Sequence, residues 1–266
     1  MLTFWQSMFI VAGTIALSFA FLFLLEWFWP GSQRTEHNDI IGWQISVLGT
    51  TYAVILAFML WNVWSNFQTA RINADAEANN LVNLYRIAGG LPSGESAALR
   101  SLCREYAAVM LSDEWPAMSH EQASPKLFDV AGRMWSTLLD SRPGGTAQGH
   151  GAAETDGFEQ IKMQQAFEVL TQLSEQRRLR QIESRLKLPA ILWGVLVVGC
   201  VVVIGSACLF GCRNLALHFI HVFVLSLLLS LVLVSIAEID RPFQGPVHVN
   251  PDAFQMALQT FDQLGK

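Results

Sequence analysis

Residues 188–237 read LPAILWGVLVVGCVVVIGSACLFGCRNLALHFIHVFVLSLLLSLVLVSIA, and Arg213 is the only Asp, Glu, Lys or Arg among them. A charged side chain at the middle of a bilayer costs about 2.5–3.5 kcal/mol on insertion scales, so such a run is typical of membrane helices. A helix of about 20 residues crosses the hydrocarbon core, and the stretches on the two sides of Arg213 each exceed that length. The segment therefore predicts two spanning helices joined by a tight connection.

Two more stretches, Met1–Leu25 and Ile40–Ala70, lack charged residues in the same way. The first has no Lys or Arg before its apolar core and is longer than the apolar region of a signal peptide, so we interpret it as a retained helix. The aromatics before Pro30 are typical of a membrane interface, and Pro30 should end that helix. With 52% hydrophobic and 15% charged residues overall, the sequence predicts an all-α integral membrane protein with four spans.

The distribution of Lys and Arg near the helix ends predicts the orientation of these spans. Four spans place both termini and the region between the second and third spans on one side. Eight basic residues lie near the helix ends of that side: Arg71, Arg86, Arg177, Arg178, Arg180, Arg185, Lys187 and Arg241. Only Arg34 and Arg213 lie on the other side. Because basic residues favour the cytoplasmic side, we expect both termini and the large domain in the cytoplasm.

The region between the second and third spans reads as helix almost throughout. No Pro or Gly occurs between Thr50 and Ile87, so we expect the second span to continue as one long helix to the break at Gly89–Pro92. Apolar residues at three-to-four spacing predict two further helices, over 95–115 and 124–139. The region should form a small helical bundle that is continuous with the second and third spans.

The last helix of this region leads toward the third span. Its apolar residues run on to Pro189, which either opens the third span or kinks one continuous helix. A Gly- and Ala-rich stretch, about 143–157, is the expected flexible linker before it. The expected domains are membrane helices over 1–66 and 188–237, a cytoplasmic helical domain over 67–187, and a cytoplasmic corner with a C-terminal docking helix over 238–266.

One face of the second span carries small and hydroxyl residues. At 100° per residue, Gly49, Thr50, Ala53 and Ala57 all lie within about 60° of Ser46, and larger residues extend the stripe toward the cytoplasm. Such a face favours either close helix packing or, if several copies meet around an axis, a pore with a hydrophobic neck. The sequence leaves both readings open. The candidate pore-lining residues are Ser46, Gly49, Thr50, Ala53, Leu56, Ala57, Leu60 and Trp64.

The remaining polar motifs indicate no chemistry. His218 and His221 read as an interfacial polar pair, because neither a carboxylate nor a Cys stands close to them in the sequence, and no metal site or cofactor is expected. The carboxylates Glu77 and Glu114 read as solvated faces or helix ends. No nucleotide-binding, protease or hydrolase motif occurs, so we expect neither an enzyme nor a nucleic-acid partner. A juxtamembrane basic segment, consisting of Arg177, Arg178, Arg180, Arg185 and Lys187, should attract anionic membrane lipids.

The last span is followed by a corner and a short helix. The corner consists of Asp240, Arg241, Pro242, Phe243 and Gly245. Pro242 and Gly245 should end the helix and turn the chain back toward the cytoplasmic bundle. After an N-cap at Asn250, a helix with apolar residues Phe254, Leu258 and Phe261 should dock there.

Several pieces, taken in order, resemble the bacterial and plant bestrophin-like family. They are Asn38–Gly42; Gly49–Phe58; Ala70, Glu77-Ala78 and Leu84-Tyr85-Arg86; Tyr106 with Glu114-Trp115; Arg177–Arg185; Leu188-Pro189 with Trp193; and Asp240-Arg-Pro-Phe-Gln-Gly245. Together they cover nearly the whole chain. The resemblance places the protein in a bacterial inner membrane as a multi-pass protein.

The resemblance also carries an expectation about function. True bestrophins are pentameric anion channels with a neck on the second helix, and an acidic run after their corner supplies a calcium clasp. The matching stretch here, Pro246–Asp252, has one carboxylate, so calcium gating is not expected. We therefore expect a homo-oligomeric ion channel, a pentamer by family analogy, that conducts anions, with chloride as the candidate ion. The alternative is a non-conducting membrane scaffold or stress sensor that acts through its cytoplasmic bundle.

Overall fold

The computed structural model describes residues 4–140 and 152–265, with side chains from residue 160 onward in the second of these ranges. Over these residues the protein consists of helices and their connections, without a strand. Four helices are long and apolar enough to cross a membrane: Trp5–Phe28, Gly31–Ala88, Ala190–Leu209 and Leu215–Ile239. The prediction of an all-α fold with four spans is confirmed. The predicted linker lies largely in the part that the structure does not describe.

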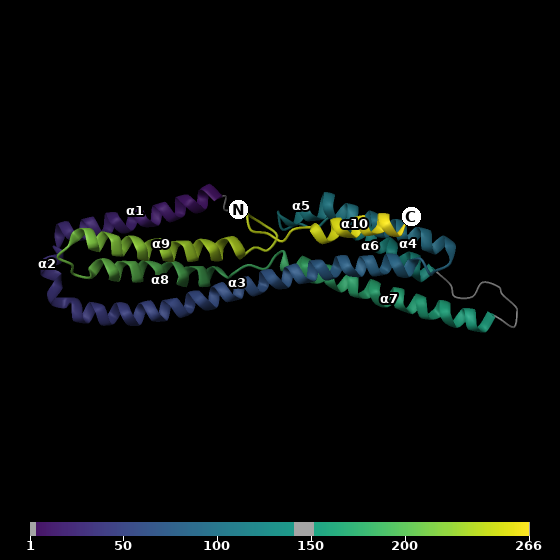
Figure 1. Cartoon of the computed structure of the whole chain (residues 1–266), viewed down its shortest axis with the longest axis horizontal. Helices are drawn as coiled ribbons and strands as arrows, with labels where there is room; N and C mark the ends of the chain where they lie inside the picture. The colour runs from purple at the N-terminus through teal and green to yellow at the C-terminus, as the bar shows by residue number, and fades with distance from the viewer. Residues whose placement is uncertain (1–3, 141–151, 266) are drawn as a thin grey trace. The chain divides into compact units, whose positions relative to one another are not determined.

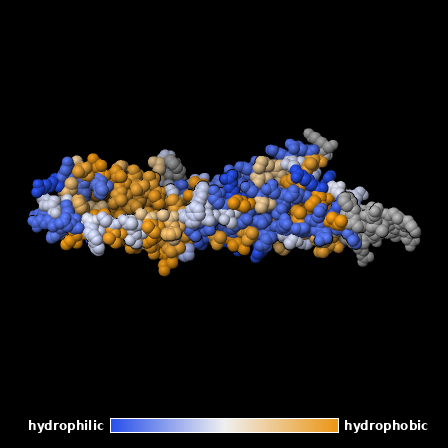
Figure 2. Space-filling view, turned by 60° about the horizontal axis from the view of Figure 1, so that its bottom comes forward, coloured by the Kyte–Doolittle hydropathy of each residue, from blue (hydrophilic) through white to orange (hydrophobic). Residues whose placement is uncertain are grey.

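The chain divides into two compact units, which we describe separately. The membrane unit comprises Met1–Phe67, Lys187–Arg241 and Gly245–Val247. The bundle unit comprises Gln68–Leu186, Pro242–Gln244 and His248–Lys266. Figure 2 shows hydrophobic residues gathered over the spanning helices and many more hydrophilic residues over the bundle unit.

The membrane unit contains α1 (Phe4–Phe28), α8 (Ala190–Leu209) and α9 (Leu215–Ile239), which pack side by side (Figure 1). Pro30 ends the first span as predicted, and a short helix α2 (Gly31–Arg34) with a 3-10 turn (Thr35–His37) leads into α3. Helix α3 (Asn38–Ala88) contributes its first half to this unit. There the Tyr52 hydroxyl donates to the Leu196 carbonyl of α8 at 2.6 Å.

Helix α3 runs without interruption for 51 residues and ends where Gly89 and Gly90 form a turn, as the sequence predicts. Pro189 opens the third span and does not kink one continuous helix. Helix α7 (Ala152–Glu183) ends before it, and α8 begins at the next residue, so a short connection separates the two helices. A proline before the first helical residue loses no helical hydrogen bond, which explains why α8 begins there.

The bundle unit packs the second half of α3 against α4 (Ser93–Val109), α6 (Pro125–Asp140), α7 and α10 (Asp252–Leu264). A π-helical turn (Met110–Glu114) and the short α5 (Trp115–Met118) follow α4. The core residues are mostly Leu, Ala and aromatic side chains. They include Leu81, Leu84, Leu99, Tyr106, Met134, Leu170 and Leu173.

Helix α10 docks into the same core, as predicted. Phe254 and Phe261 are fully buried, and Leu258 is partly buried beside them. Fully burying a large apolar side chain stabilises by about 1.5–3 kcal/mol, so these residues hold the helix in place. The expected N-cap at Asn250 is wrong, because Pro251 occupies that position and no side chain caps the helix.

Candidate functional site

The other described residues of the chain leave the small-residue face of α3 largely exposed. Ser46, Thr50, Ala53 and Ala57 are exposed, and Gly49 is half-buried. A Cβ added at Gly49 would have no atom within 4 Å, so the surface there is open. The first half of the helix therefore presents hydroxyl groups and small side chains outward over about three turns.

Leu56 does not belong to this face and must be removed from the predicted lining. Its side chain is 6% exposed and packs in the core of the membrane unit with Tyr52 and Val63. At 100° per residue, Leu56 lies about 80° from Ser46 and within about 40° of both core residues. Angular position on the helix, rather than hydrophobicity, decides its role.

Toward the bundle unit, large apolar side chains replace the small ones on this exposed face of α3. Ala57, Leu60, Trp61 and Trp64 line a groove with a volume of about 370 Å³. The Trp64 ring is 44% exposed and stacks on Phe67, with ring centroids 6.1 Å apart. Large apolar side chains thus follow the small ones along a single helix face.

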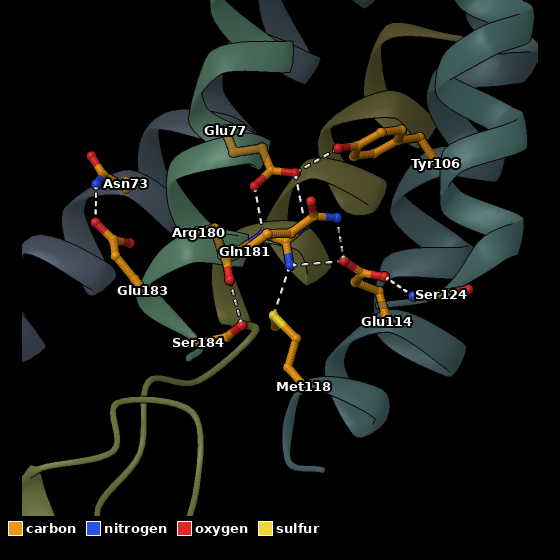
Figure 3. Close-up of polar contacts among 10 residues, drawn as sticks. All are labelled: Asn73, Glu77, Tyr106, Glu114, Met118, Ser124, Arg180, Gln181, Glu183 and Ser184. Atoms are coloured by element: carbon orange, nitrogen blue, oxygen red, sulfur yellow. Dashed lines mark hydrogen bonds and ion pairs between the residues drawn. The ribbon is translucent and has the colours of Figure 1, made fainter. Parts of the chain in front are cut away.

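A second candidate site lies inside the bundle unit and centres on Arg180 (Figure 3). The Arg180 Nε donates to Glu77 Oε2 of α3 at 2.7 Å, and its Nη1 donates to Glu114 Oε1 at 3.3 Å. Its Nη1 also lies 2.7 Å from the Met118 sulfur. Arg180 and both carboxylates are fully buried. One guanidinium therefore joins α3, α7 and the segment that follows α4.

The carboxylates of this network have further donors. The Tyr106 hydroxyl donates to Glu77 Oε1 at 2.5 Å, and the Ser124 backbone N–H donates to Glu114 Oε2 at 2.5 Å. Glu114 stands at the end of the π-helical turn, where the wider turn changes the direction of the side chains that follow α4. Buried carboxylates of this kind need such partners, because an unpaired charge in the interior is strongly unfavourable.

The network fixes the protonation states of its donors. Burial alone would lower the pKa of the Arg180 guanidinium, but the charge of Glu77 and its hydrogen bonds raise that pKa above the ordinary value. Burial raises the pKa of the Tyr106 hydroxyl, and the neighbouring charge of Glu77 raises it further. Arg180 therefore stays charged and Tyr106 stays neutral, so both remain donors.

These contacts correct three predictions. Glu77 and Glu114 are not solvated, and Arg180 is not part of an exposed basic segment. The sequence held a signal for two of them: Glu77 lies seven residues from both Ala70 and Leu84 on the apolar stripe of α3, and Arg180 lies seven residues after Leu173. Positions seven apart share a helix face, so these charges stand on core-facing stripes.

The rest of the basic segment behaves differently. Arg178 pairs with Glu175 at 2.8 Å on the surface of α7. The Arg177 guanidinium lies over the Phe128 ring, 5.6 Å from its centroid. Arg185 and Lys187 are exposed. Lipid attraction by these residues remains a prediction.

The short connections of the membrane unit also contain a buried charge. Arg34 is fully buried; it pairs with Glu26 and donates to the Cys208 carbonyl at 2.5 Å. The Nδ1 of His218 lies 3.8 Å from Glu26 Oε1. The prediction of an interfacial histidine pair is therefore wrong, because His218 is buried beside a carboxylate while His221 is exposed.

The predicted corner after α9 is present. The helix ends at Ile239, and the Asp240 carboxylate accepts a hydrogen bond from the Leu188 backbone N–H at 2.8 Å. Gly245 has φ +83°, a conformation that residues with a Cβ rarely adopt. Within the bundle unit, the Phe243 ring contacts Trp115 edge-to-face, with centroids 5.5 Å apart.

Comparison with known proteins assigns this arrangement to a family. The sequence profile described as Bestrophin-like domain matches residues 12–254, which is most of the chain. The chain belongs to the bestrophin-like family. No curated protein matches this bestrophin-like sequence. The family is one of membrane proteins rather than enzymes, and this member is a multi-pass membrane protein.

Solved structures share the fold of this bestrophin-like protein. A variant of a bacterial bestrophin homolog from Klebsiella pneumoniae matches with a TM-score of 0.62 and 14% identity, over 98% of this chain and 100% of that chain. Another variant of a homolog from the same organism matches with a TM-score of 0.59 and 16% identity, over 97% and 99% of the two chains. At these identities the likeness shows the fold alone.

Proposed function

We propose that this bestrophin-like protein is a homo-oligomeric ion channel that conducts anions and whose pore is lined by α3. The observation that carries the proposal is the uncovered face of α3, where Ser46, Thr50, Ala53 and Ala57 point away from their own subunit. Hydroxyl groups and small side chains around an axis leave room for water and ions. The same face would be hard to explain in a monomer, because ordinary lipid-facing helices are lined by larger apolar residues.

The proposed neck of the pore lies at the end of this face where Ala57, Leu60, Trp61 and Trp64 line a groove. Leu60 and Trp64 follow the small residues at helical spacing and are the first large side chains on the stripe. A ring of such side chains, one set from each subunit, narrows a pore and makes its wetting sensitive to small movements. We propose five subunits, by analogy with the true bestrophins.

The proposed preference for anions rests on charge. The lining from Ser46 to Trp64 contains no Asp or Glu, whereas cation channels commonly select with rings of carboxylates. Exposed basic residues next to the membrane, among them Arg178 and Arg185, would raise the local anion concentration if several subunits present them together.

We further propose that the bundle unit and both termini lie in the cytoplasm of a bacterial cell. Two of the basic residues in this comparison are buried in ion pairs, Arg34 on the side opposite the bundle unit and Arg180 on the side of the bundle unit. Without them the excess of Lys and Arg still lies on the side of the bundle unit.

Planar-bilayer recording of the purified protein tests the proposal. We expect a chloride current from the unaltered protein, and a larger conductance from Leu60→Ser because a polar side chain eases wetting of the neck. Val201→Ser is the matched control, because it also replaces an apolar side chain by serine, on another spanning helix. Val201 is 65% exposed on α8. That variant should conduct like the unaltered protein.

Three outcomes would contradict the channel. They are a monomeric protein in mild detergent, the absence of current in bilayers, and a lipid-filled axis in the assembled oligomer. Any of them would favour the non-conducting scaffold. A current that is unchanged in Leu60→Ser would instead remove the pore from this face of α3.

A further inference from the structure

Helices α3 and α7 are joined in the bundle unit by two polar contacts, one helical turn apart (Figure 3). In the first, Asn73 Nδ2 donates to Glu183 Oε1 at 2.5 Å. In the second, Arg180 Nε donates to Glu77 Oε2 at 2.7 Å. Residue numbers rise along α3 as they fall along α7, so the helices run antiparallel at this crossing. Beyond it, the contact becomes apolar, with Leu residues on both helices in the core.

The buried charges at this crossing are not balanced. Glu77 of α3, Glu114 of the π-helical turn and Glu183 of α7 are all buried, and Arg180 is the guanidinium that contacts the first two. Arg177 is half-buried on the same helix. Since Arg180 already contacts two carboxylates, the negative charge of a third ionised carboxylate on this crossing would be compensated only in part, in a medium that screens charge poorly.

Glu183 is the carboxyl group that is least well satisfied. Its side chain is 7% exposed, and its Oε1 has Asn73 as donor. Its Oε2 is buried without a hydrogen-bond partner among the described residues. Burial raises the pKa of Glu183, and the hydrogen bond from Asn73 and the charge of Arg180 offset only part of this effect. A buried carboxyl group with one unpaired oxygen is less costly as the neutral acid than as the anion.

We propose that Glu183 is a proton-binding site that controls the contact between α3 and α7. With the proton bound, the neutral acid keeps its hydrogen bond with Asn73 and the helices stay together. When the proton returns to water, the buried carboxylate is left with one oxygen that has no hydrogen-bond donor among the described residues, and the contact between α3 and α7 weakens because water must reach that charge. Because α3 continues as one helix into the membrane unit, this contact also regulates the pore, a step that rests on the proposed channel function.

The sign of the pH dependence follows from the direction of the pKa shift. An acid whose pKa is raised by folding binds more protons in the folded than in the unfolded state over the interval between the two pKa values. Its contribution to stability is therefore complete below the ordinary glutamate pKa of about 4.3 and is lost as the pH rises through the raised value. The unaltered protein should unfold at lower temperatures as the pH rises through this interval.

Infrared spectroscopy of the full-length protein in lipid tests proton binding directly. We expect the carbonyl stretch of a protonated carboxylic acid to persist above the ordinary pKa range of glutamate, and to disappear in Glu183→Gln. The matched control is Glu175→Gln, two turns earlier on α7, where the carboxylate is exposed and paired with Arg178. This variant should keep the band. A band that is missing from the unaltered protein, or that survives in Glu183→Gln, would overturn the proposal.

Thermal unfolding and current separate the proton site from the channel. The thermal unfolding midpoint should fall with rising pH in the unaltered protein and in Glu175→Gln. It should not fall in Glu183→Gln, since glutamine imitates the neutral acid and accepts the same hydrogen bond. Currents should respond to cytoplasmic pH in the unaltered protein and lose that response in Glu183→Gln. A pH response that survives in this variant would reject regulation by Glu183. A protein with the infrared band but without current at any pH would reject the channel and keep the proton site.

Discussion

Replacing Arg180 by methionine measures how strongly the buried network holds the bundle unit together. The change removes the guanidinium that contacts Glu77 at 2.7 Å and Glu114 at 3.3 Å. Breaking a buried pair by removing one partner costs about 3–5 kcal/mol, because the remaining carboxylates lose their counter-charge away from water. Methionine fills part of the vacated volume, so loss of charge pairing should dominate. For a unit of this size, we expect a thermal midpoint roughly 10–15 °C lower.

Circular dichroism of the full-length protein in detergent, recorded during heating, is a suitable assay. Arg178→Met is the matched control, because this arginine pairs with Glu175 on the surface and its removal should leave the midpoint unchanged. Adding Glu77→Gln and Glu114→Gln to Arg180→Met should restore most of the lost stability, since neutral amides no longer need the guanidinium. Equal midpoints for Arg180→Met and Arg178→Met would refute the reasoning.

Two other predictions concern a helix contact in the membrane unit and the orientation of the chain in the membrane. A Cβ at Gly199 would lie 2.4 Å from the Tyr52 ring, so Gly199→Ala should destabilise the protein by about 1–3 kcal/mol. Gly194→Ala should not destabilise it, because a Cβ at Gly194 would have no atom within 4 Å. Equal thermal midpoints for the two variants would contradict this prediction. In a background without native cysteines, an impermeant maleimide applied to intact cells should label Ser32→Cys but label Gln255→Cys only after lysis, and the reverse pattern would overturn the proposed orientation.

Local chemistry explains why much of the fold can be predicted from the sequence. The spans follow from long runs without charge, since the cost of a charge in hydrocarbon is a property of the side chain and the solvent. The end of the first span follows from Pro30, and the continuation of α3 into the bundle unit follows from the absence of Pro and Gly between Thr50 and Ile87. The corner at Pro242 is likewise encoded by the residues that form it.

The candidate pore face was predictable only in part. Spacing alone placed the small residues of α3 on one side, and all of them except the half-buried Gly49 are exposed among the described residues. Leu56 was assigned to that side because it is a large apolar residue near the expected neck, yet it packs beside Tyr52. Which side of α3 packs against the other membrane helices depends on where α8 lies, and the sequence of α3 does not contain that information.

The sequence by itself determined that this is a four-span helical membrane protein, because hydrophobicity, helix period and helix-breaking residues act over a few turns of one segment. Only the tertiary structure decided which charges are buried. Arg180 lies 103 residues from Glu77 and 66 from Glu114, and Arg34 lies 174 residues from the Cys208 carbonyl. Whether such a charge meets water or a partner depends on helices that are distant in the sequence. The same dependence brings Glu183 against Asn73 and buries its carboxyl group.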